Sequence, residues 1–273
     1  MKRILVATAC ALLSLPLAAQ RAVTIKGSDT MVIMNARLSE AFMRANPGTV
    51  VQVTGGGSGV GIAALLNGTT EFAAASRPIK TSEIDKLKAR FATRGVEIAV
   101  ARDGLAVYLH EKNPVRELTM QQVADLYMGK IVNWKQVGGP DAPVVLYSRE
   151  NSSGTYVYFK DNVLRGRDFS ARAQTLQGTA AVVNAVSKDV NGIGYGGAAY
   201  AKGIRFAGIR KDANSKAETP TLESVKSGRY PITRFLYLYS RTAPKGDAKK
   251  FVDFTLSPAG QQIVTQVGYF PVK

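Results

Sequence analysis

Apolar residues along the chain follow two spacings, one typical of short buried strands and one typical of amphipathic helices. The run 23–26 is rich in β-forming residues, and apolar side chains then recur every three or four positions from Met31 to Phe42, before Asn46-Pro47-Gly48 ends the helix. The same strand, turn and helix pattern returns at 50–66 and at 72–91. Strands that alternate with helices predict an α/β fold with a mainly parallel sheet.

A second group of elements begins near residue 105. We expect strands at 96–100 and 104–110, and a helix that starts with a capping box formed by Thr119 and Gln122. Further along the chain we expect a strand at 144–147, a helix with Tyr156, Phe159 and Val163, and a strand at 192–196.

The C-terminal part of the chain is expected to return to the first group. The run 232–239 has a strong β pattern, and Ser257-Pro258 opens a final helix that ends at Gly268. The sequence therefore predicts two lobes with two chain crossings, near 102–108 and 230–237, that act as a hinge. The predicted boundaries are 20–104 plus 235–273 for lobe 1 and 105–234 for lobe 2.

Residues 1–19 differ in composition from the rest of the chain. Lys2 and Arg3 precede an apolar run from Ile4 to Leu17, which is typical of a cleaved secretory signal peptide. We therefore expect a periplasmic mature protein, with a signal anchor as the alternative, although the apolar run is short for a span of ~20 residues. Cys10 is the only cysteine, and unless it is kept as a lipid anchor the mature chain has no disulfide, thiol nucleophile or Cys-based metal site.

The formal net charge of +16 indicates affinity for anions without saying which kind. Nucleic acid, an anionic surface and a small anionic ligand would all be compatible with this charge. The basic residues are scattered, with no basic tail and no interleaved aromatic residues. We therefore interpret most of them as a solvated surface and expect no nucleic-acid partner.

Three strand-to-helix turns place hydroxyl groups and glycines where a helix begins. They contain Ser28 and Thr30, Ser58 and Gly59, and the run 153–155. A helix N-terminus exposes unpaired N–H groups and the positive end of the helix dipole, so it binds oxyanions readily. Each serine alone could be an ordinary N-cap, but three such turns together predict an oxyanion site.

Arginine residues lie close to two of these turns. Arg149 stands four residues before Ser153, where its guanidinium could make two parallel hydrogen bonds to an oxyanion. Arg77 follows a similar strand and is either a second cationic ligand or the ion-pair partner of a nearby glutamate or aspartate.

Other kinds of site lack their signatures. His110 is the only histidine, which excludes a multi-histidine metal site. No serine lies in a G-x-S-x-G motif, and no glycine-rich turn continues into Gly-Lys-Ser/Thr. Gly59-x-Gly61-x-x-Ala64 matches a dinucleotide fingerprint, which is a weak signal alone. We expect no catalytic residues, no metal and no cofactor.

Several short motifs, taken in order, resemble those of periplasmic phosphate-binding proteins of ABC importers. The likeness covers essentially the whole mature chain, and its most specific element is Arg149 with Ser153-Gly154-Thr155. The motifs are Gly27-Ser28-Asp29-Thr30-Met31, Gly55-Gly56-Gly57-Ser58-Gly59, Ala75-Ser76-Arg77-Pro78, Asp103-Gly104-Leu105-Ala106-Val107 and Arg149-Glu150-Asn151-Ser152-Ser153-Gly154-Thr155.

This resemblance implies a type II periplasmic-binding-protein fold, with two α/β lobes, a two-crossing hinge and a dehydrated anion held by hydrogen bonds. It also implies a monomer that works with a membrane permease and an ATPase. The family's binding positions correspond to Thr30, Met31, Ser58, Arg149, Ser153, Gly154 and Thr155. Ser28, Asp29 and Arg77 complete the set of candidate ligand-binding residues.

The chain departs from the family at two positions. Well-known members have Ser-Asp where this chain has Ser76-Arg77, and that Asp accepts the proton of hydrogen phosphate. Some members have an Asp that supports the arginine where this chain has Asn151. We expect Asp29 to replace the missing acceptor, with a helix-capping role as the alternative and Asp103 as the next candidate.

The function expected from these features is capture of inorganic phosphate for import, without covalent chemistry. The alternatives are another oxyanion such as sulfate or molybdate, a secreted phosphate-ester hydrolase, and adhesion to an acidic polymer.

Overall fold

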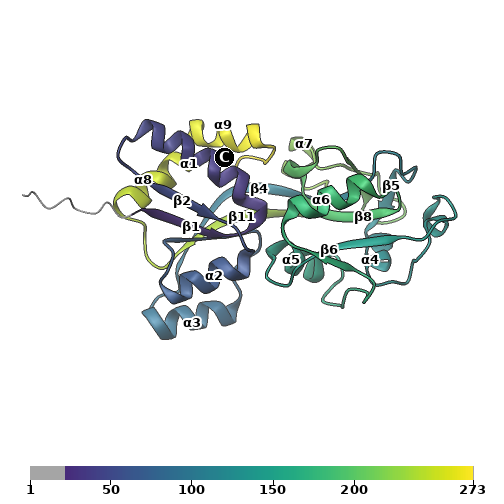
Figure 1. Cartoon of the computed structure of the whole chain (residues 1–273), viewed down its shortest axis with the longest axis horizontal. Helices are drawn as coiled ribbons and strands as arrows, with labels where there is room; N and C mark the ends of the chain where they lie inside the picture. Colours follow the sequence, from purple (N-terminus) through teal and green to yellow (C-terminus); the bar gives the residue numbers. More distant parts are fainter. Residues whose placement is uncertain (1–21, 273) are drawn as a thin grey trace, which may run out of the picture.

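The computed structural model describes residues 22–272, so the predicted signal peptide and Cys10 lie outside the described part of the chain. The described residues form two α/β lobes that lie side by side (Figure 1). Two long strands, β4 (Val96–Leu109) and β11 (Thr233–Ser240), run between the lobes. The predicted fold class, a two-lobed α/β fold, is confirmed.

Lobe 1 is a five-stranded sheet covered by helices on both faces. The strand order is β2-β1-β3-β11-β4, with β1 parallel to β2 and β3 and with β11 antiparallel. Helices α1, α8 and α9 cover one face, and α2 and α3 lie on the other (Figure 1). Besides β4 and β11, its elements are β1 (Val23–Gly27), η1 (Asp29–Met31), α1 (Val32–Ala45), β2 (Val51–Thr54), α2 (Ser58–Asn67), β3 (Phe72–Ala75), α3 (Thr81–Phe91), α8 (Gly246–Leu256) and α9 (Pro258–Val267).

Lobe 2 continues the same sheet in the order β4-β8-β6-β7, with β9 beside β4 and a separate small sheet of β5 and β10. Its helices pack around an aromatic core in which the rings of Phe159 and Tyr195 stack with centroids 4.0 Å apart. Its elements are β5 (Glu117–Thr119), α4 (Met120–Tyr127), η2 (Trp134–Val137), β6 (Val145–Arg149), α5 (Gly154–Asn162), β7 (Gln174–Leu176), α6 (Gly178–Lys188), β8 (Gly192–Gly197), η3 (Ala198–Tyr200), β9 (Arg205–Phe206), β10 (Gly208–Arg210) and α7 (Leu222–Lys226).

Strand β4 connects the lobes because it pairs with a different strand in each of them. Its residues 96–104 pair with β11 in lobe 1, and residues 105–109 pair with β8 in lobe 2. The strands predicted at 96–100 and 104–110 are therefore one continuous strand. Because β4 has a strand partner in each lobe, with one bulge at Val100, most of its backbone groups stay paired as the chain passes between the lobes.

The C-terminal tail adds a contact across the hinge. The backbone of Phe270 exchanges two hydrogen bonds with Arg102 of β4, at 2.7 and 2.9 Å. Tyr269 is buried in the main core of lobe 1, whereas the ring of its neighbour Phe270 packs against the core of lobe 2. Consecutive residues of the tail therefore pack into different lobes.

Sequence patterns predicted most, but not all, of these elements. The strand-turn-helix units at the N-terminus, the capping box of Thr119 and Gln122, and the last helix with Ser257 as its N-cap are confirmed. Helices α6 and α8 were not predicted. Helix α6 contains β-branched residues and small side chains, and α8 is rich in charged residues, so neither has a strong helical signal by itself.

Candidate functional site

Hydroxyl groups from three turns meet at the junction of the two lobes. The turn after β1 carries Thr30, whose Oγ1 lies 2.9 Å from Oγ1 of Thr155 in the first turn of α5. Ser58, the first residue of α2, accepts a hydrogen bond at its Oγ from the backbone N–H of Ser76, at 3.1 Å. These four residues are buried. They come from both lobes, so the prediction that the turns lie together agrees with their positions in the structure.

Gly154 allows these turns to approach closely. A Cβ added at this residue would lie 2.2 Å from Oγ of Ser58 and 2.7 Å from Oγ of Ser76. Such distances are well below van der Waals contact, so only glycine fits here without movement of the serines. Nearby, the N–H of Gly59 donates to the carbonyl of Ser152 at 2.9 Å, which links lobe 1 directly to lobe 2.

Arg149 ends β6 inside the site, and its side chain is only 1% exposed. Its Nε and Nη2 donate to the two carboxylate oxygens of Glu150 at 3.0 and 2.8 Å. Nη2 also donates to Asp29 at 3.0 Å, and Nη1 donates to Thr179 at 2.8 Å. The remaining N–H of Nη1 has no partner among residues 22–272. A two-pronged contact to an oxyanion, as expected from the sequence, would therefore require some of these bonds to change.

Asp29 has a different environment from the one expected of a proton acceptor. Its Oδ2 accepts from Arg149, and its Oδ1 accepts from the N–H of Gly56 at 2.8 Å. The side chain is 20% exposed, and its two hydrogen bonds go to Gly56 and Arg149 and not to the N–H groups of its own helix. Both oxygens already have donors, so Asp29 positions Arg149 and joins the lobes. The backbone carbonyl of Asp29 accepts from the hydroxyl of Tyr200, whose pKa burial raises to about 12.

Arg77 forms an ion pair, and its side-chain hydrogen bonds within residues 22–272 go to Glu83 and to the carbonyl of Pro78. Its Nη1 and Nη2 donate to the two oxygens of Glu83 at 2.9 and 2.7 Å. Burial acts to raise the pKa of Glu83, but hydrogen bonds from Arg77 and from the N–H of Lys80 outweigh it and hold that pKa below its usual value. Of the two roles considered for Arg77, the geometry supports the ion pair and argues against a ligand role.

The remaining predicted residues contribute backbone or capping groups. Ser153 is the N-cap of α5, and its Oγ accepts from the N–H groups of Thr155 and Tyr156 at 3.2 and 3.3 Å. Ser28 is buried beside η1 and makes no capping bond through its side chain. The side chain of Met31 belongs to the core of lobe 1, so only its backbone could face an anion.

Sequence reasoning assigned no role in the site to four residues. Ser76 contacts Ser58, while Glu150 and Thr179 hold Arg149. Arg234 of β11 pairs with Asp103 of β4 across the hinge. Glu150 could have been found, because an acidic residue beside a predicted buried arginine is a natural partner. Thr179 and Arg234 come from distant parts of the chain and have no local signal, whereas Ser76 lies within the motif 75–78 beside the candidate Arg77.

The described residues offer little for other kinds of chemistry. They contain no group of three or more His, Cys, Asp or Glu side chains that could hold a metal ion.

Among these residues, no helix has the length and apolar character needed to cross a membrane. His110 lies just after β4 and accepts a hydrogen bond from the N–H of Lys112 at 3.0 Å.

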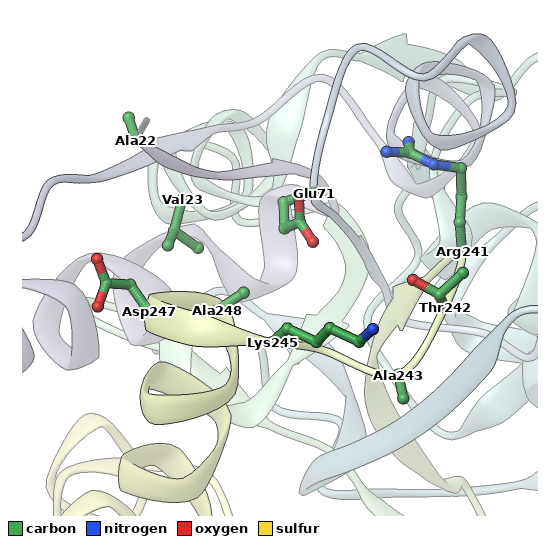
Figure 2. A pocket seen from close by; sticks show the side chains of 9 residues that line it. All are labelled: Ala22, Val23, Glu71, Arg241, Thr242, Ala243, Lys245, Asp247 and Ala248. Atoms are coloured by element: carbon green, nitrogen blue, oxygen red, sulfur yellow. The ribbon is translucent and has the colours of Figure 1, made fainter. Parts of the chain in front are cut away.

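A cavity of about 520 Å³ opens on the surface of lobe 1 (Figure 2), and no predicted site residue lines it. Its wall carries charges of both signs, including Glu71, Lys245 and Asp247 (Figure 2). Arg241 at its edge is already bound to the backbone carbonyls of Leu65 and Thr70. The cavity therefore presents no concentrated set of donors for an oxyanion, unlike the junction of the lobes.

Comparison with known proteins shows that this chain is similar to phosphate-binding proteins. The family described as the PBP superfamily domain matches residues 16–259. The phosphate-binding protein PstS of Pseudomonas aeruginosa is 31% identical over 263 residues, covering 90% of this chain and 81% of that protein. Protein SphX of Synechococcus elongatus is 33% identical and covers 93% of this chain and 79% of its own length.

The fold of this chain is also similar to that of a solved structure. It is a candidate phosphate ABC transporter substrate-binding protein from Clostridium perfringens, crystallised with bound phosphate. It is 32% identical to this chain, with a TM-score of 0.82, and the match covers 93% of this chain and 100% of that one.

Proposed function

Because the chain belongs to the PBP superfamily, among the phosphate-binding proteins of ABC importers, we propose that it captures inorganic phosphate between its two lobes for import. The observation that carries this proposal is the buried set of hydroxyl and N–H donors around Arg149, drawn from both lobes. Oxyanions suit such a site, because helix N-termini and a guanidinium supply hydrogen bonds and positive potential together.

The proposed binding residues are Thr30, Ser58, Arg149, Gly154 and Thr155, with Ser28, Met31 and Ser153 contributing backbone or hydroxyl groups. Ser76 is added because its Oγ lies 3.4 Å from that of Ser58 and faces Gly154. In this proposal Asp29 and Glu150 act through Arg149, which they hold in position. Arg77 is left out because it is paired with Glu83.

Binding is proposed to bring together lobe 1, residues 20–104 plus 235–273, and lobe 2, residues 105–234. Direct contacts between the lobes support this movement, since Thr30 meets Thr155, and Asp29 meets Arg149, across the junction. The hinge would be β4 and β11, where few backbone angles need to change.

The protein is further proposed to act in the periplasm as a monomer and to deliver phosphate to a permease driven by an ATPase. The names of its relatives support this setting, since they include phosphate-binding and ABC transport proteins. No covalent step, metal or cofactor enters the proposal.

Calorimetric titration of ligand-stripped protein tests the proposal directly. Phosphate should bind with one-to-one stoichiometry, and Arg149→Ala should weaken binding by about 2 to 5 kcal/mol because a charge-assisted contact to a desolvated anion is lost. The variant's melting temperature without phosphate shows whether it folds. If the wild type releases no heat and gains no thermal stability with phosphate, the proposed function is wrong.

A further inference from the structure

Asp103 is a completely buried carboxylate at the point where β4 crosses between the lobes. It stands opposite Arg234 of β11, and its Oδ2 accepts from Nε and Nη2 of that arginine at 3.0 and 2.8 Å. The other oxygen, Oδ1, has no hydrogen-bond partner within residues 22–272. A buried charged oxygen without a donor is costly, so its position requires an explanation.

Oδ1 of Asp103 lies next to the hydroxyl residues of the site. A Cβ placed on Gly197 would be 3.2 Å from Oδ1 of Asp103 and equally 3.2 Å from Cγ2 of Thr30. Thr30 is the residue whose hydroxyl meets Thr155 from the other lobe. The free oxygen is therefore a neighbour of the proposed anion-binding groups.

The pairing with Arg234 also connects Asp103 to the opposite side of the site. Nη1 of Arg234 donates to the carbonyl of Ser76 at 3.0 Å, and Ser76 contacts Ser58. The guanidinium lies over the ring of Tyr158, 5.5 Å from its centroid. Arg234 is thus held on several sides, and it fixes one oxygen of Asp103 while the other remains available.

The three carboxylates near the site differ in what their oxygens can still accept. Both oxygens of Glu150 bind Arg149, and both oxygens of Asp29 have donors. Only Asp103, among these three, has an oxygen without a donor from the described residues. It is also the most completely buried, so an anion next to it could not be screened by water.

We propose that Asp103 is the specificity-determining residue of the site, whose Oδ1 accepts the hydrogen bond of a protonated tetrahedral oxyanion. This inference rests on the proposed phosphate-binding function. Hydrogen phosphate can donate to Oδ1, whereas sulfate has only acceptors and meets a buried negative charge. The acceptor in this proposal is therefore a residue of the hinge strand β4.

The test compares four anions by calorimetry at neutral pH. Phosphate and arsenate keep a proton at this pH, while sulfate and monofluorophosphate do not. A site built around a hydrogen-bond donor on the ligand rejects analogues that lack it, so the wild type should prefer the first two by at least about a hundredfold.

Asp103→Asn provides the decisive comparison. The amide oxygen can still accept from Arg234, so the amide NH2 takes the place of Oδ1 and turns an acceptor into a donor. Phosphate should bind more weakly and sulfate at least as well as before, and the phosphate-to-sulfate affinity ratio should fall at least about tenfold. Asp29→Asn is the matched control, and it should change the four affinities by a common factor because Asp29 acts through Arg149.

The outcomes separate this inference from the proposed function. Phosphate binding by the wild type with an unchanged ratio in Asp103→Asn would overturn the role of Asp103 and leave phosphate capture intact. If Asp103→Asn does not fold, the affinities of the wild type for phosphate and monofluorophosphate test the proposal. Equal affinities would rule out an acceptor that recognises the proton of phosphate.

Discussion

At the scale of single residues, the site depends on the lack of a side chain at Gly154 as much as on the groups that bind. Gly154 starts α5 and faces the hydroxyl groups of Ser58 and Ser76 from the other lobe. Any larger residue would have to push those hydroxyls aside or hold the lobes apart. The identity of this residue therefore determines how closely the two lobes can approach, which no property of lobe 2 alone would indicate.

We predict that Gly154→Ala weakens phosphate binding by about 10- to 100-fold, because overpacking a tight contact typically costs ~1 to 3 kcal/mol. Gly59→Ala is the matched control, since its added Cβ would lie 3.3 Å from the carbonyl of Ser152 and needs only a small adjustment. Titration calorimetry measures both variants, and melting without phosphate reports the fold. Near-native affinity in Gly154→Ala would show that the lobes do not need this close approach.

At the scale of elements, Arg77 and Glu83 fasten helix α3 to the end of β3. The arginine follows the strand, Glu83 lies in the first turn of the helix, and their side chains are 6% and 16% exposed. The same carboxylate accepts from the N–H of Lys80, which completes the helix N-terminus. Both partners lie in lobe 1, so we expect the pair to contribute to the stability of that lobe and not to anion binding.

This arrangement predicts a specific dependence of stability on pH. The folded-state pKa of Glu83 lies below the usual value of 4.5, so the carboxylate stabilises the protein above that pH and loses its contribution as the pH falls through the lowered pKa. The free-energy difference between the wild type and Glu83→Gln should therefore be largest near neutrality and shrink in acid. Denaturant unfolding across this range measures it.

Asp85→Asn, on an exposed position of the same helix, is the control and should show no comparable pH dependence. Phosphate affinity should stay close to native in Glu83→Gln. A large loss of affinity in that variant would mean that Arg77 takes part in binding after all.

At the scale of the whole molecule, the excess of positive charge and the binding site are separate features. The formal net charge is +16, yet the side chains around the site include three carboxylates and two arginines: Asp29, Asp103, Glu150, Arg149 and Arg234. Affinity for phosphate must therefore come mainly from local hydrogen bonds in a buried environment. Surface charge acts at longer range and is screened by salt.

We predict that raising the salt concentration from about 0.05 to 0.5 M lowers phosphate affinity by less than about tenfold, because buried contacts are screened weakly. Retention of the protein on heparin or duplex DNA should be lost over the same range, as counterion release requires. Calorimetry and column retention under identical buffers measure the two effects. A parallel loss of both would favour the acidic-polymer alternative over a buried phosphate site.

Elements with local signals can be predicted from the amino-acid sequence alone. The spacing of apolar residues and the turn residues around Gly48, Gly68 and Gly268 predict the helices that end there, and hydroxyl-bearing turns before helices predict an oxyanion site. The predicted helices are present in the structure because each depends on neighbours within a few residues. The same holds for Ser153, which caps its own helix.

Which charged side chains face the site depends on contacts between distant parts of the chain. Arg77 could be a ligand or half of an ion pair, and packing places Glu83 within reach of it. Asp29 follows strand β1, and both of its oxygens have donors. Asp103 lies within strand β4, where Arg234 of β11 binds one oxygen and the other stays buried without a donor from the described residues. Hydrogen-bond partners distant along the chain carry no local pattern, so the roles of these carboxylates follow from how the strands pair and how the lobes meet.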